Sequence, residues 1–232
     1  MESGDLVIAV FEFVLLLFSL CVHECAHAWT ASRLGDNTAR ELGRVTLNPI
    51  EHIDPIGTLL FPAIIIFGPL VGFTFFSGLL IGWAKPTPVL TRNFRRIVRD
   101  DNLTTLAGPA SNLLIVLVAF LVMAGISLVS RTDHALVAYI FQGVSSGLEA
   151  VVLLCSLAIL INLSLFFFNL LPIPPLDGSH LLRNMLPYNA AQAYDRIPIW
   201  VSYLLMMVLG GTVVRLMLGP AVALVNWALS HI

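Results

Sequence analysis

The side chains best suited to chemistry in this chain are two histidines and a glutamate in the sequence His23-Glu24-Cys25-Ala26-His27. Residues i and i+4 of an α-helix lie on one face, so both imidazoles of an H-E-x-x-H sequence can bind one metal ion. Glu24 lies on the same turn. The pattern predicts that His23 and His27 bind zinc and that Glu24 acts as the general base toward a zinc-bound water.

A catalytic zinc site usually has three protein ligands and one open position for water, so a third ligand is expected elsewhere. The best candidate is Asp177, which follows Pro172, Pro174 and Pro175. These prolines interrupt the preceding helix, and Gly178 allows close approach of the backbone, so the carboxylate can turn toward the metal. The alternative is that Asp177 only caps the helix that follows it. We favour Asp177 as the third ligand of one zinc ion per chain.

Two asparagines lie in apolar stretches of the sequence, Asn112 and Asn169. Either side chain can donate a hydrogen bond to a developing oxyanion or hold the backbone of a substrate. The alternative is that these amides join neighbouring helices, as amides do in membrane bundles. On the residues alone, both interpretations stay open for each asparagine.

Three further residues are rival or supporting candidates for the metal site. His52 and Asp54 lie in a stretch rich in turn-forming residues, so a loop or capping role is favoured over metal binding. His180 lies three residues beyond Asp177 and can hydrogen-bond to that carboxylate. For His180 the favoured alternative is a partly exposed position at the membrane interface.

The composition places this chemistry inside a membrane. Of the 232 residues, 58% are apolar and 11% are charged, whereas soluble domains carry about a quarter charged residues. Such a chain cannot cover itself with a polar surface, so we predict a multi-pass integral membrane protein surrounded by the lipid bilayer. The net charge of −2 gives no reason to expect a nucleic acid as a partner.

The apolar segments predict an all-α bundle of about four to six transmembrane segments. We expect one domain over residues 1–232, because no hydrophilic stretch is long enough for a second. Stretches of about 20 apolar residues span the hydrocarbon core. The expected core spans are at about 6–34, 103–129 and 148–171, and a C-terminal span at about 197–218 ends at a bend near Gly219-Pro220.

Segment 57–83 is apolar but interrupted by prolines and glycines. It is too short for two full helical spans of about 20 residues each. If it dips into the membrane and returns, the basic residues on both sides of it share one face, and the positive-inside rule makes that face cytoplasmic and places the N-terminus outside. We therefore predict a re-entrant or broken segment, shielded by protein or by a water-filled cavity.

A peptide bond inside a membrane-spanning helix must be freed from its own hydrogen bonds before it can be attacked. The edge of a β-strand would stabilise such an unwound peptide, and proline is tolerated on edge strands. This pattern predicts a substrate-binding strand element near the site at Gly82, Trp83, Ala84, Lys85 and Pro86. The alternative is an ordinary proline-rich loop at the interface.

Taken together, three motifs resemble the site-2 protease family of intramembrane zinc metalloproteases. They are His23–His27, Gly108-Pro109-Ala110-Ser111-Asn112, and Asn169-Leu170-Leu171-Pro172 leading to Leu176-Asp177-Gly178. The resemblance implies that His23, His27 and Asp177 bind zinc, that Glu24 is the base and that Asn112 and Asn169 assist. It also implies a β-structured element at 82–89. The chain looks like the small stand-alone bacterial form, without a PDZ or CBS module, in the inner (cell) membrane.

The function expected from these residues is zinc-dependent endoproteolysis of a membrane-embedded peptide or protein. Such cleavage serves regulated intramembrane proteolysis or the clearance of signal-peptide remnants. One alternative is a membrane metal-binding or transport protein that uses the same three ligands without hydrolysis. Another is a membrane-anchored zinc peptidase whose site faces water, which would normally need a soluble catalytic domain. The natural substrate and the oligomeric state are not readable from the sequence.

Overall fold

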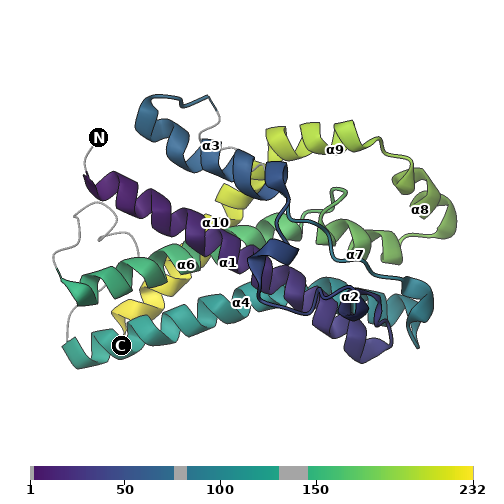
Figure 1. The fold of residues 1–232 in the computed structure, drawn as a ribbon, viewed down its shortest axis with the longest axis horizontal. Helices are drawn as coiled ribbons and strands as arrows, with labels where there is room; N and C mark the ends of the chain where they lie inside the picture. The colour runs from purple at the N-terminus through teal and green to yellow at the C-terminus, as the bar shows by residue number, and fades with distance from the viewer. Residues whose placement is uncertain (1–2, 76–82, 131–145, 232) are drawn as a thin grey trace.

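The computed structural model describes residues 3–75, 83–130 and 146–231. Within these ranges every regular element is helical (Figure 1). Helices long and apolar enough to cross a membrane are α1 (Ser3–Leu34), α4 (Ile97–Ser130), α6 (Gly147–Asn169) and α10 (Gly211–Ser230). The predicted all-α polytopic architecture is confirmed. The core spans expected at 6–34, 103–129 and 148–171 fall on α1, α4 and α6.

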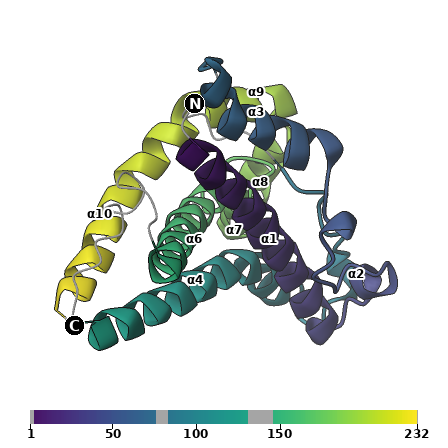
Figure 2. The same cartoon turned by 60° about the vertical axis from the view of Figure 1, so that its left-hand side comes forward.

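The three helices α1, α4 and α6 pack together, and α6 is enclosed between α1, α4 and α10 (Figure 2). The side chains of Val152 and Ile159 on α6 are fully buried, as is Met123 on α4. By contrast, the outer sides of α1 and α4 expose large apolar residues such as Phe18 and Leu117. Helices that are apolar on every side are expected where lipid surrounds the bundle.

A helical run follows the short helix α2 (Thr38–Glu41) and the 3₁₀ turn η1 (Pro49–Glu51). It consists of the π-helical η2 (Pro55–Leu60), α3 (Phe61–Phe67) and the 3₁₀ turn η3 (Gly68–Val71). The carboxylate of Asp54 accepts hydrogen bonds from the backbone N–H groups of Ile56 and Gly57, so it caps this run as predicted. The run lies beside α1, where the rings of Phe13 and Phe67 are 5.7 Å apart.

At Trp83 the chain lies again beside the first residues of this helical run. The N–H of Trp83 donates to the carbonyl of Gly57 at 3.2 Å, and the N–H of Lys85 donates to the carbonyl of His52 at 2.9 Å. A Cβ on Gly57 would lie 2.4 Å from the indole of Trp83, so glycine is needed for this contact. The two ends of segment 57–83 therefore lie side by side, while its re-entry into a membrane stays a prediction.

The strand element predicted at 82–86 is not seen. Gly82 lies outside the described residues, Trp83–Leu90 has no regular secondary structure, and no strand occurs in the ranges that the structure describes. The N–H groups of the alternate residues Trp83, Lys85 and Thr87 all donate hydrogen bonds. However, these donors bond to a helix, a turn and a side chain, and prolines lack the N–H that a ladder needs.

The C-terminal part differs from the expected span at 197–218. Between α6 and this part lie α7 (Asp177–Met185) and α8 (Tyr188–Asp195). Helix α9 (Ile199–Leu205) then continues through the π-helical η5 (Met206–Gly210) into α10, and the run changes direction at η5 (Figures 1 and 2). The helix does not end at Gly219-Pro220 as the expected boundary implies, because Pro220 lies within α10. A π-bulge beside two glycines is a common cause of a helix kink.

Candidate metal centre

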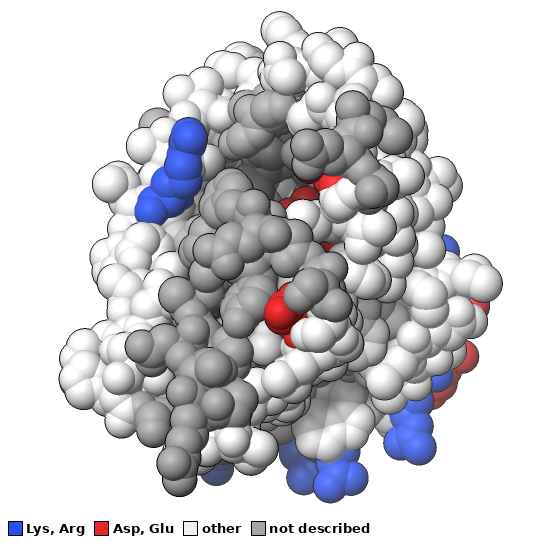
Figure 3. Space-filling view, turned by 90° about the vertical axis from the view of Figure 1, so that its left-hand side faces the viewer, with Lys and Arg blue, Asp and Glu red and all other residues white. Residues whose placement is uncertain are grey.

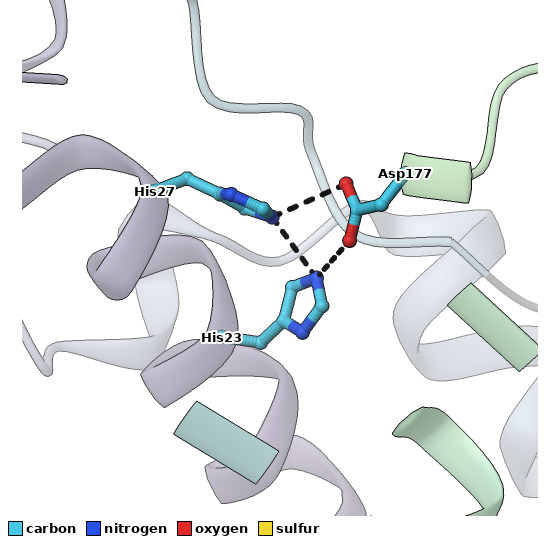
Figure 4. Close-up of side chains that lie close together, drawn as sticks. All are labelled: His23, His27 and Asp177. Atoms are coloured by element: carbon cyan, nitrogen blue, oxygen red, sulfur yellow. Dashed lines mark hydrogen bonds and ion pairs between the residues drawn. The ribbon is translucent and has the colours of Figure 1, made fainter. Parts of the chain in front are cut away.

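The side chains of His23, His27 and Asp177 meet at one point of the structure (Figure 4). The Nε2 of His23 lies 3.1 Å from Oδ2 of Asp177, and the Nε2 of His27 lies 3.4 Å from Oδ1. The two Nε2 atoms are 3.0 Å apart. We call these three residues the trio. The first and last members of the trio, His23 and Asp177, are 154 residues apart in sequence, so only the tertiary fold brings them together.

Two elements place the trio. The histidines lie one turn apart on α1, and Asp177 is the first residue of α7, directly after the loop that contains the prolines. Gly178 packs so closely against the end of α6 that a Cβ there would lie 2.2 Å from the carbonyl oxygen of Leu170. Only glycine fits this contact. The contact brings the start of α7, and with it the carboxylate, toward α1.

In both histidines the Nδ1 atom, which faces away from the trio, forms a hydrogen bond. The Nδ1 of His23 lies 2.7 Å from Oδ1 of Asn112, and the Nδ1 of His27 lies 2.7 Å from the carbonyl oxygen of Thr104. Since these oxygens only accept, each Nδ1 carries the proton and each neutral ring presents the lone pair of its Nε2. This is the usual arrangement of metal-binding histidines, in which a hydrogen bond at one nitrogen orients the other.

The trio fits a zinc ion. Two Nε2 lone pairs and a carboxylate would repel one another at these distances unless a positive charge lay among them. The Oδ2 of Asp177 is buried, and among the described residues it meets only the Nε2 of His23, with no hydrogen-bond donor assigned to it. Gly108 of α4 faces the same point, and a Cβ there would lie 2.4 Å from Nε2 of His27 and 2.6 Å from Nε2 of His23. Two imidazoles and one carboxylate are an established ligand set for catalytic zinc.

A hydrogen-bonded chain across three helices fixes His23. Asn112 is fully buried, and its Nδ2 donates to Oδ1 of Asn162 on α6 at 2.8 Å. The Nδ2 of Asn162 in turn donates to Oγ of Ser19 at 2.9 Å and to the carbonyl of Ala158 at 2.8 Å. These bonds fix the orientation of both amides, so that Oδ1 of Asn112 must face His23.

This chain of bonds shows what Asn112 contacts. Its Oδ1 faces His23, and one of the two hydrogens on its Nδ2 goes to Asn162. Asn112 therefore orients a predicted zinc ligand and joins helices, which was the alternative interpretation; its expected role toward an oxyanion or a substrate stays a prediction. Sequence reasoning missed Asn162 and Ser19, although an amide within the apolar run of α6 was a usable signal.

Asn169 lies at the end of α6 and is half-buried. Its Nδ2 donates to the carbonyl of Leu165, one turn earlier on the same helix, at 3.0 Å. It does not contact the trio, so a role for Asn169 in holding substrate stays a prediction.

Glu24 is half-buried and lies outside the trio, one residue after His23. Its carboxylate oxygen Oε2 accepts hydrogen bonds from Thr87, at 3.0 Å from the N–H and 2.7 Å from the hydroxyl. Thr87 was not singled out in the sequence, because threonine in a proline-rich loop carries no pattern of its own.

The rival ligands are placed elsewhere in the described structure. His52 is buried with its Nε2 3.0 Å from the carbonyl oxygen of Thr46, so it serves the loop. Asp54 is the cap described above. His180 is exposed and forms no hydrogen bond to Asp177 in the described chain.

Asp36 is a buried carboxylate that the sequence did not mark as important. It accepts hydrogen bonds from the N–H of Leu90 at 2.7 Å and from Nδ2 of Asn93 at 2.8 Å, besides two from Thr38. Burial alone would raise the pKa of the Asp36 carboxyl, but these hydrogen bonds lower it below its ordinary value. Asp36 thus holds the chain around residues 90–93 against the end of α1. This attachment comes shortly after Thr87 in the sequence.

Comparison with known proteins gives consistent matches over most of the chain. The sequence model of peptidase family M50 matches residues 11–210. "Putative zinc metalloprotease YwhC" of Bacillus subtilis is 37% identical over 174 residues, covering 75% of this chain and 68% of YwhC. "Putative zinc metalloprotease Rip2" of Mycolicibacterium smegmatis is 31% identical over 204 residues, covering 87% of this chain and 68% of Rip2. No solved structure matches the chain.

Proposed function

Because the chain belongs to peptidase family M50, the site-2 protease family, we propose that it is a zinc-dependent endopeptidase that hydrolyses peptide bonds of membrane-embedded substrates. The observation that carries this proposal is the convergence of His23, His27 and Asp177 among apolar helices. Cleavage of this kind serves regulated intramembrane proteolysis or removes signal-peptide remnants.

In this proposal the trio holds one zinc ion and Glu24 moves the protons. A bound zinc ion polarises the scissile carbonyl and lowers the pKa of a water to about 7. The carboxylate of Glu24 takes the proton of the attacking water and delivers it to the leaving amine. Asn112 keeps His23 in the tautomer that presents Nε2. Gly108 keeps a side chain out of the space beside both rings.

The substrate must lie in extended form beside these groups. We assign this role to the irregular chain Trp83–Pro86, with Asn169 as a further contact for the backbone of the peptide. The N–H groups of Trp83 and Lys85 both donate to the stretch 52–57, which fixes this chain on one side. An extended peptide can pair with the opposite side of such a chain.

We place the protein in the bacterial cell membrane with its N-terminus outside. Charged side chains are few on the described atoms of the end that carries the N-terminus (Figure 3). At the other end, exposed arginines precede the apolar part of α4, as the positive-inside rule expects of a cytoplasmic face; they are Arg92, Arg95, Arg96 and Arg99. His27 then lies about 10 Å from the cytoplasmic end of α1, at 1.5 Å per residue.

Replacing the general base tests this function. We expect Glu24→Gln to abolish cleavage of a membrane-spanning peptide in liposomes while zinc content stays that of the wild type, because an amide takes no proton and Glu24 is not a ligand. Zinc content is measured on the same purified sample. Glu41→Gln, at an exposed acid on α2, is the matched control and should cleave normally. Full cleavage by Glu24→Gln, or metal transport by an inactive wild type, would contradict the proposal.

A further inference from the structure

Glu24 is held through only one of its two carboxylate oxygens. The N–H of Thr87 donates to Oε2 at 3.0 Å, and the hydroxyl of Thr87 lies 2.7 Å from the same oxygen. The hydroxyl also lies 3.1 Å from the backbone oxygen of Glu24. In the described chain, Oε1 has no hydrogen bond to the protein. One oxygen is therefore anchored, and the other is left to exchange a proton.

The residues beside Thr87 make it a fixed donor. Pro86 and Pro88 have no N–H, so Thr87 carries the only backbone donor among these three residues. A residue that precedes proline is also restricted to extended conformations. On either side, the N–H of Lys85 bonds to His52 and the N–H of Leu90 bonds to Asp36. The chain is thus held before and after Thr87, which gives its two donors a set position against α1.

We propose that Thr87 is the positioning residue for the base. It holds Oε2 of Glu24 so that Oε1 faces the attacking water, and it acts only through Glu24. This inference rests on the proposed function, because it assigns the orientation of the proposed base. A glutamate side chain without such an anchor populates several rotamers, and a base misplaced by about 1 Å can lose up to about 100-fold in rate.

The test compares two substitutions at the same position in the zinc-loaded protein. Thr87→Val keeps the shape and the N–H but removes the hydroxyl, and we expect kcat to fall about tenfold with KM and zinc content unchanged. Thr87→Ser restores the hydroxyl and should recover kcat to within about twofold of the wild type. Thr91→Val, at an exposed threonine of the 3₁₀ turn η4 (Thr91–Asn93) on the same chain, is the control and should leave kcat unchanged.

Three results would overturn the assignment. An unchanged kcat in Thr87→Val would show that the hydroxyl does not position the base. Equal losses in Thr87→Val and Thr87→Ser would assign the effect to packing. A higher kcat in Thr87→Val would mean that the hydrogen bond from Thr87 restrains Glu24 and slows the reaction.

A second measurement separates this inference from the proposed function. Melting temperatures of the purified full chain are compared for the wild type, Thr87→Val, Glu24→Ala and the double variant. We expect Thr87→Val to lower the melting temperature of the wild type by more than that of Glu24→Ala, because the carboxylate contact is already lost in Glu24→Ala and only the contact with the backbone oxygen of residue 24 remains. Additive shifts would disprove the contact. If the wild type failed to cleave peptides, the proposed function would be disproved, but the comparison of melting temperatures would still test the contact between Thr87 and Glu24.

Discussion

The two imidazoles of the trio face each other through nitrogens that carry no proton. Their outer nitrogens donate to Asn112 and Thr104, which fixes both tautomers. The facing Nε2 atoms are 3.0 Å apart and a carboxylate lies beside them. Three electron-rich groups in a buried site repel one another unless a positive charge lies among them, and a metal ion would supply that charge without a proton on either Nε2.

Gly108 provides a test of the space beside the rings. We expect Gly108→Ala to weaken zinc binding at least about tenfold, because the new methyl group would displace both imidazoles from their positions. Gly125→Ala on the same helix is the matched control, since a Cβ there meets nothing within 4 Å. Zinc affinity is measured by competition with a chelator. Equal affinities in the two variants would contradict the close packing of α4 on the site.

Asn162 is expected to act on zinc without touching it. We predict that Asn162→Ala weakens zinc affinity about 10- to 100-fold, because Asn112 loses the partner that orients its amide toward His23. Ser164→Ala on the same helix serves as the control, since the hydroxyl of Ser164 bonds only within α6. The same chelator competition measures both variants. If Asn162→Ala bound zinc as tightly as Ser164→Ala, the hydrogen-bonded chain would have no part in metal binding.

At the scale of single residues, chemistry restricts which types can form a metal site. His23, His27 and Asp177 were singled out because histidine spacing and an acid after a broken helix are visible patterns, and the structure brings these three together; that they bind zinc stays a prediction. The family resemblance is confirmed by the M50 match. Asn162, Thr87 and Asp36 were not found, because their importance depends on partners that lie far away in sequence. Asn112 was singled out in the sequence, and the structure shows it fully buried with contacts to His23 and Asn162.

At the scale of elements, the segment between α1 and α4 has the largest effect on the site. The helical run of this segment begins after its cap, Asp54, and Trp83, further along the segment, lies beside Gly57 at the start of that run. The returning chain then crosses α1 at Glu24 and is fastened by Asp36. No strand forms in the described part of the predicted element, because a helix carbonyl, a turn carbonyl and a side chain, rather than a neighbouring strand, accept hydrogen bonds from its N–H groups.

Asp36 provides a pH-dependent test of this fastening. We expect Asp36→Asn to lower the free energy of unfolding by about 1–3 kcal/mol at neutral pH, because buried donors lose a charged acceptor. The pKa of Asp36 is lowered in the folded state, so its contribution is fully present above the ordinary carboxyl pKa of 3.8 and is lost as pH falls through the lowered value.

The measurement is thermal unfolding in detergent from pH 7 down into the acid range. The difference between wild type and Asp36→Asn should shrink only at the acid end. Glu41→Gln, at an exposed acid of α2, should show no such difference at any pH. A constant difference between wild type and Asp36→Asn across the range would mean that the carboxylate charge is not what holds the returning chain.

At the scale of the whole molecule, the bundle brings His23 and Asp177, which are far apart in sequence, to one point. The transmembrane spans were predictable because a run of about 20 apolar residues matches the thickness of the hydrocarbon core and has few other structural roles. The C-terminal boundary was not, since a π-bulge at Met206–Gly210 has no reliable sequence pattern, whereas the proline at 220 is accommodated inside α10. Packing of α1 against α4, and of α7 against α4, places His23 and Asp177 around the same point.

The zinc content of the purified full chain tests this convergence most directly. We predict close to one zinc ion per chain in the wild type, and loss of that zinc in both His27→Ala and Asp177→Asn, since each removes one of three ligands. Asp195→Asn is the control, because that exposed carboxylate pairs with Arg183 outside the trio, and it should keep its zinc. Wild-type zinc content in Asp177→Asn would contradict the account, because Asp177 would then have no part in holding the metal.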